Sequence, residues 1–236
     1  PEFVQNPYGF YRQAQRHGDI SFWEDYGMPA AFSHRAVSAL LKDRRFGREI
    51  PVEMLTQPPA LLAPFYAVEA HSMLELEPPR HTRLRGLVLR AFTSRRIKQL
   101  APEITQLCHD FLKATPITPG KLAEPFDLIA QFANKLPVIV IARLLGVPDS
   151  MADQLLAWSN AMVAMYQARR DVEIEARAVC AARDFVAFMR DYIKARRSQP
   201  QDDLITHLIA AEEDGEKLSI DELITTCILL LNAGHE

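Results

Sequence analysis

An apolar run near the end of the chain constrains the fold more than any other stretch. From Leu223 to Ala233 most side chains are apolar, and at helical spacing they fall on every face. A helix that is apolar all round belongs inside a large protein or in a membrane. The run is about a dozen residues long, short of the roughly 20 that cross a bilayer. We therefore predict that it forms the central helix of a large helical core.

The two ends of this helix carry different signals. Ser219 is followed three residues later by Glu222, which is the pattern of a capping box at a helix start. At the other end stands Gly234, and Gly within a helix costs roughly 1 kcal/mol relative to Ala. Either Gly234 caps a terminal helix, or the chain stops within the helix just as a functional stretch begins. The second interpretation is favoured, because no Pro and no loop-like composition follow.

Bulk composition limits the class of protein. The 236 residues allow one large domain or two small ones, and 48% hydrophobic with 24% charged residues is typical of a soluble globular protein. A formal charge of −3 argues against nucleic acid and anionic membranes as partners. No signal peptide or membrane span is evident, so we expect a cytoplasmic protein. Cys108, Cys180 and Cys227 are too far apart for a disulfide framework or a zinc cluster, and each is expected to be a small core hydrophobe.

Hydrophobic spacing predicts a single, mainly α domain over residues 1–236. Strand-like stretches at 20–26 and 29–32 predict one small β hairpin near residues 20–32. Residues 47–76 contain four prolines and predict a long connection without regular structure. Before the final helix, helical spacing is found over 6–18, from the capping residue Ser33 to 45, and over 78–92, 94–115, 127–145, 150–166, 170–197 and 202–213.

A basic stretch from Glu77 to Lys98 is the most informative polar segment. Seven Lys or Arg and no acid lie between Arg80 and Pro102. His81 and Arg85 are four residues apart, so they share one face of the predicted helix. Such a face can hold two carboxylates, with the Arg binding one of them as a planar, bidentate fork.

Three interpretations of this basic helix compete. It is a solvated surface helix, or a nucleic-acid helix, or a clamp for an anionic cofactor held against the apolar central helix. The nucleic-acid interpretation suits the Arg count, but only Phe92 could stack on a base and the whole chain is acidic. Only the cofactor clamp connects the basic helix with the apolar one.

Four stretches together resemble a bacterial cytochrome P450, a haem-thiolate monooxygenase, over the whole chain. The first and last are specific when they occur at this separation, and the middle two are supportive. In order they are MLELEPPRHTRLR at 73–85, LLGVP at 144–148, DDLITHL at 202–208 and NAGHE at 232–236. The resemblance implies the N-terminal part of the cytochrome P450 fold.

The resemblance also implies roles for particular residues around a haem b cofactor. His81 and Arg85 would bind the haem propionates. Ala233 and Gly234 would lie over the distal face, where a missing side chain leaves room for dioxygen. Glu236 would be the acid of the proton-delivery pair, whose usual Thr partner would be the next residue.

A hydrophobic small molecule is the substrate that the resemblance implies. Met73, Leu74 and Leu230 would line the substrate pocket, under a cover formed by residues 47–76. Electrons would come from a redox partner of ferredoxin type.

The chain departs from the family pattern in what it lacks. The proximal Cys loop and the Glu-x-x-Arg helix are not found, and none of the three cysteines lies in a Gly-rich loop. A thiolate ligand allows this class to cleave the O–O bond, so we expect an inactive, truncated fragment whose iron ligand lies outside the chain. With part of its central helix uncovered, the fragment is expected to self-associate. The alternative is an all-helical module that binds a small ligand without catalysis.

Overall fold

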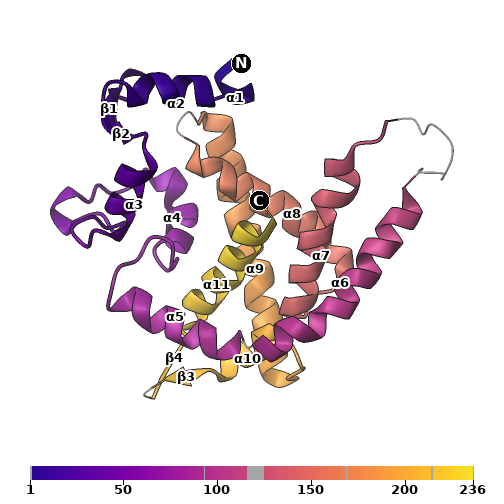
Figure 1. The fold of residues 1–236 in the computed structure, drawn as a ribbon. Coiled ribbons are helices and arrows are strands. Elements are labelled where there is room, and N and C mark those ends of the chain that lie inside the picture. The colour runs from indigo at the N-terminus through magenta and orange to yellow at the C-terminus, as the bar shows by residue number, and fades with distance from the viewer. Residues whose placement is uncertain (1, 93, 116–124, 168–169, 214, 236) are drawn as a thin grey trace. The chain divides into compact units, whose positions relative to one another are not determined.

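Two compact units make up the computed structural model, Pro1–Ile50 and Pro51–Glu236. The structure describes residues 2–92, 94–115, 125–167, 170–213 and 215–235. Helices dominate the described residues, so the predicted mainly α class is confirmed (Figure 1). That the whole chain is part of one larger domain stays a prediction.

The first unit contains the predicted hairpin. Strands β1 (Ile20–Trp23) and β2 (Met28–Ala31) pair antiparallel, with Ile20 opposite Ala31. The end of the predicted first strand is wrong, because residues 24–26 form a 3-10 turn that closes at Gly27 with a φ of 62°. The helices are α1 (Glu2–Gln5), α2 (Tyr8–Gln15) and α3 (His34–Lys42). The predicted cap of α3 is confirmed, since Ser33 Oγ accepts a hydrogen bond from the Ala36 amide at 3.1 Å.

The second unit is built from eight α-helices among the described residues. They are α4 (Ala63–Glu69), α5 (Arg80–Ala91), α6 (Ser94–Ala114), α7 (Lys135–Leu145), α8 (Ala152–Val163), α9 (Val172–Ser198), α10 (Leu204–Ala210) and α11 (Ile220–His235). Short helical turns lie at Val52–Met54, Ala60–Leu62, Asp149–Met151 and Ala164–Tyr166, and a π-helical turn at Ile129–Ala133. The end of the helix predicted over 202–213 is wrong, because α10 ends at Ala210 and a second hairpin follows. This hairpin, of β3 (Glu212–Glu213) and β4 (Glu216–Lys217), was not predicted, because two-residue strands leave no periodicity to detect.

The prediction that residues 47–76 lack regular structure is wrong in its second half. Helix α4 lies there, with Pro64 in its first turn, where the missing amide hydrogen costs nothing. Phe65 and Val68 are buried and give α4 an apolar face. The sequence did not indicate this helix, because seven residues give only two turns of apolar periodicity in a stretch with four prolines.

Helix α11 is the central helix, as predicted. Its capping box is confirmed: the Ser219 amide donates to Glu222 Oε2 at 2.8 Å, and the Glu222 amide donates to Ser219 Oγ at 3.2 Å. Every residue from Leu223 to Ile228 is buried. Helices α4, α7, α8, α9 and α10 all contact α11 (Figure 1). Among the described helices, none combines the length and the apolar composition needed to cross a bilayer.

The prediction of buried cysteines holds for Cys227 and is wrong for Cys180. Cys227 is fully buried, and burial, with the charge of Asp203 as a smaller cause, raises the pKa of its thiol to about 12. Cys108 is half-buried and Cys180 is exposed. At about 100° per residue, Cys180 lies roughly opposite the buried Ala178 on α9, so it faces solvent.

Thiol alkylation should separate these cysteines. The thiolate is the reactive species, so at about pH 8 iodoacetamide should modify Cys180 quickly and leave Cys227 protonated and unmodified. Mass spectrometry of native and denatured protein measures this, with modification of all three thiols in denaturant as the control. If native Cys227 reacted as fast as Cys180, the buried position of α11 would be wrong.

Candidate cofactor-binding site

A cavity of about 720 Å³ lies between α5, α7 and the last turns of α11. This volume is within the range of roughly 300–1,000 Å³ found for small-molecule sites. Its wall is mostly apolar, with Val88, Phe92, Val140 and Leu144 among the lining side chains. The cavity brings together seven of the residues predicted to form the site: Met73, Leu74, His81, Arg85, Leu230, Ala233 and Gly234.

Beyond its first turn, helix α11 emerges from the core where it reaches this cavity. Its middle is buried on all faces, whereas Ala233 and Gly234 are exposed and Leu229 and Leu230 are partly so. These four residues are also the ones that line the cavity. The open face of α11 is therefore the cavity wall.

The predicted catalytic acid is Glu236, the last residue of the sequence. Glu236 lies outside the described residues. Its role as a proton donor stays a prediction.

Three basic residues of α5 are in different electrostatic situations. Arg83 forms an ion pair with Glu222 of α11, and its Nε lies 3.3 Å from Glu216 Oε2. His81 and Arg85 face the cavity, and within the described part of the chain neither side chain has a hydrogen bond or an ion pair. The imidazole of His81 and the guanidinium of Arg85 are therefore available to a ligand at the cavity wall. The charge of Arg83, which lies between them in the sequence, is balanced by Glu216 and Glu222.

The ion pair of Arg83 fixes the rotation of α5. At about 100° per residue, residues 81 and 85 lie on one side of a helix and residue 83 lies on the other. Because Arg83 is held by Glu222, the imidazole and the guanidinium are held toward the cavity. The Arg83 side chain is 30% exposed and that of Glu222 is 12%, so water screens this pair less than a surface pair.

These features fit an apolar cofactor that carries two carboxylates. His81 and Arg85 would each take one carboxylate, with the guanidinium as a bidentate donor. A ligand for the iron of a haem is not found at this site, since no cysteine lines the cavity among the residues the structure describes.

Gly234 has a packing role that the sequence did not reveal. A Cβ at this position would collide with Cδ1 of Ile141 on α7 and would lie 3.4 Å from its Cγ1. The missing side chain therefore lets α11 approach α7 closely. The interpretation that Gly234 leaves room for dioxygen stays a prediction.

A polar network behind the cavity was also missed from the sequence. Ser159 of α8 donates a hydrogen bond to Asn232 Oδ1 at 2.6 Å, and His235 Nε2 lies 2.5 Å from Ser159 Oγ. The available signal was the presence of two polar residues, Asn232 and His235, in an otherwise apolar run.

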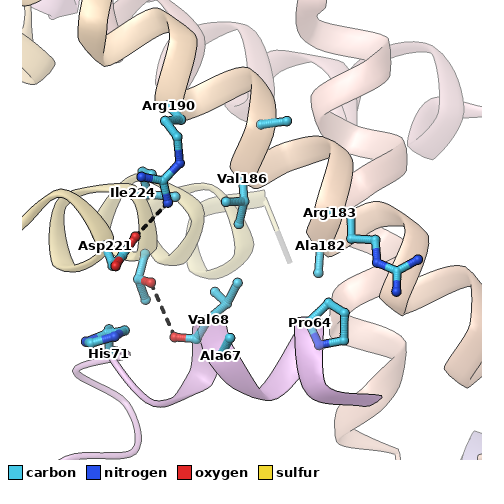
Figure 2. Close-up of a pocket in the computed structure, with 12 residues that line it drawn as sticks. Pro64, Ala67, Val68, His71, Ala182, Arg183, Val186, Arg190, Asp221 and Ile224 are labelled. Carbon is cyan, nitrogen blue, oxygen red and sulfur yellow. Dashed lines mark hydrogen bonds and ion pairs between the residues drawn. The ribbon is translucent and has the colours of Figure 1, made fainter. Parts of the chain in front are cut away.

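A second cavity, of about 470 Å³, lies between α4, α9 and α11 (Figure 2). An ion pair between Arg190 and Asp221, 2.7 Å long, lies at its edge. Thr225 Oγ1 donates to the Val68 carbonyl oxygen at 3.3 Å beside it. Of the predicted site residues that the structure describes, none lines this cavity.

Comparison with known proteins identifies the family, although no family model matches the chain. Cytochrome P450 CYP107DY1 of Priestia megaterium is 31% identical over 252 residues, which cover 100% of this chain and 59% of that protein. Mycinamicin IV hydroxylase/epoxidase of Micromonospora griseorubida is 38% identical over 164 residues, 70% of this chain and 39% of that protein. The crystal structure of P450BioI in complex with an acyl carrier protein ligated to hexadec-9Z-enoic acid matches with a TM-score of 0.87 and 30% identity, covering 100% of this chain and 59% of that one.

The fold and the sequence together define the class as cytochrome P450. The chain belongs to the bacterial members of this family, as the resemblance in its four sequence stretches predicted. It spans at most 59% of the length of these relatives.

The contact of Gly234 with Ile141 can be tested by substitution. Gly234→Ala gains about 1 kcal/mol of helix propensity but costs about 1–3 kcal/mol of overpacking, so we expect net destabilisation of about 1 kcal/mol. Adding Ile141→Val removes Cδ1 and should recover most of this loss. Urea unfolding of the full-length protein provides the measurement.

A matched control is Gly9→Ala on α2, where a Cβ would meet nothing within 4 Å. This variant should be at least as stable as the parent. A Gly234→Ala variant as stable as the parent, with no coupling to Ile141→Val, would contradict the close packing of α11 on α7.

Proposed function

We propose that this chain is part of a haem-dependent monooxygenase that hydroxylates a hydrophobic small molecule, using dioxygen and electrons from a redox partner. The observation that carries the proposal is one apolar cavity shared by His81, Arg85 and the bare face of α11 at Ala233 and Gly234. A related protein named a hydroxylase/epoxidase supports the reaction class.

In this proposal His81 and Arg85 hold the two propionates of haem b. Among the described residues neither of them pairs with a carboxylate, whereas Arg83 binds the carboxylates of Glu216 and Glu222. When bound, the haem supplies dioxygen activation, which in this class depends on a cysteine thiolate as iron ligand. That thiolate would come from outside the described residues, because Cys227 is buried in the core and no cysteine lines the cavity.

The apolar part of the cavity would bind the substrate. Met73, Leu74 and Leu230 would contact it and exclude water from the reacting region. Glu236 would deliver a proton from the end of α11. A ferredoxin-type protein is proposed as the electron donor.

A ligand-binding module without catalysis is the second candidate function. The observation that favours it is the same cavity, which has the size of a small-molecule site and contains no cysteine among its described residues. The two candidates differ in whether the full-length protein carries a thiolate-ligated iron.

One experiment on the full-length protein tests the proposal. The reduced, carbon-monoxide-bound protein should show the long-wavelength Soret band typical of thiolate ligation. His81→Ala combined with Arg85→Ala should lower haem affinity about tenfold or more, because charge-assisted hydrogen bonds are lost, while the haem-free protein keeps its melting temperature.

The matched control removes the same two residue types elsewhere. His109→Ala combined with Arg177→Ala changes two exposed residues that do not line the cavity, and should leave haem affinity unchanged. A folded, haem-loaded protein without the long-wavelength band would favour the binding module. Equal haem affinity in both double variants would remove His81 and Arg85 from the site.

A further inference from the structure

We propose that Ser159 of α8 is a positioning residue for the haem cavity. Its hydroxyl fixes the rotation of the last turn of α11, so that Ala233 and Gly234 face the cavity. This inference rests on the proposed function, because it concerns the helix face that would lie over the cofactor.

Ser159 is the centre of a buried polar network. It is 0% exposed and Asn232 is 7% exposed. The Ser159 hydroxyl has a single proton, which it donates to Asn232 Oδ1 at 2.6 Å. His235 Nε2 lies 2.5 Å from Ser159 Oγ. Because the hydroxyl proton is already donated, we infer that Ser159 Oγ accepts a hydrogen bond from a proton on His235 Nε2.

The network and the cavity lie on opposite sides of α11. At about 100° per residue, Asn232 and His235 fall on one side of the helix. The residues that line the cavity fall on the other side: Leu229, Leu230, Ala233 and Gly234. A rotation of α11 by about one residue would turn Asn232 toward the cavity and move Gly234 away from Ile141.

The close contact of Gly234 with Ile141 favours this rotation, and the hydrogen bonds of Ser159 add a directional constraint to it. Leu223, Ile224, Cys227, Ile228 and Leu231 surround the helix with apolar groups, and the hydrophobic effect has no directional preference. Hydrogen bonds are directional, and buried polar groups left without a partner are costly. The two hydrogen bonds of Ser159 therefore distinguish the observed rotation from its neighbours.

Ser159→Ala removes both hydrogen bonds of the network with a small change in volume. The matched control is Thr226→Val, which removes a buried hydroxyl from α11 itself. Thr226 Oγ1 donates to the Glu222 carbonyl oxygen at 2.7 Å, far from the last turn. Both variants are made in the full-length protein, and their melting temperatures identify any general loss of folding.

Carbon monoxide affinity of the reduced, haem-loaded protein reports the space over the cofactor. We expect Ser159→Ala to change this affinity about fivefold or more, since a lost buried hydrogen-bond network allows the last turn to rotate. Thr226→Val should change it less than twofold. Wild-type affinity in a folded Ser159→Ala variant would overturn the proposal.

Two measurements on the haem-free protein test the role of Ser159 without depending on haem binding. Nitrogen-15 chemical shifts of the His235 ring should show the proton on Nε2, and a proton on Nδ1 alone would overturn the network. Hydrogen exchange of the amides at 232–235 should accelerate in Ser159→Ala and not in Thr226→Val. If the protein bound no haem, this exchange pattern would still establish the positioning role, and its absence would reject it.

Discussion

The ion pair between Arg83 and Glu222 is the interaction on which the site depends. Glu222 has two functions at once: one carboxylate oxygen closes the capping box of α11 and the other binds Arg83 of α5. The start of the central helix is thereby tied to the basic helix. Because Arg83 is held on one side of α5, His81 and Arg85 are presented on the other, where the cavity lies.

Helix α11 changes character along its length, and this change creates the site. From Leu223 to Ile228 it is a core element, buried on every face. In its last turns one face opens into the cavity, while the opposite face makes the hydrogen bonds of Asn232 and His235 with Ser159. The middle of α11 is thus covered on all sides, whereas its last turns expose one face to the cavity. Hydrogen bonds to Ser159 hold the opposite face.

Long periodic helices, the capping box and the shared helix face of His81 and Arg85 could be predicted from the sequence, because their signals are local. Helix α4 could not, since its seven residues offer too little periodicity among the prolines. The network around Ser159 was not predictable either, because Ser159 and Asn232 are 73 residues apart. The exposed face of Cys180 likewise depends on which side of α9 the other helices cover.

The most direct test of the account is a crystal structure of the full-length protein loaded with haem. The account predicts that the propionates contact the imidazole of His81 and the guanidinium of Arg85, with Arg83 still bound to Glu222. It also predicts that Ala233 and Gly234 face the haem. Propionates bound by other residues, or a haem held away from this cavity, would contradict it.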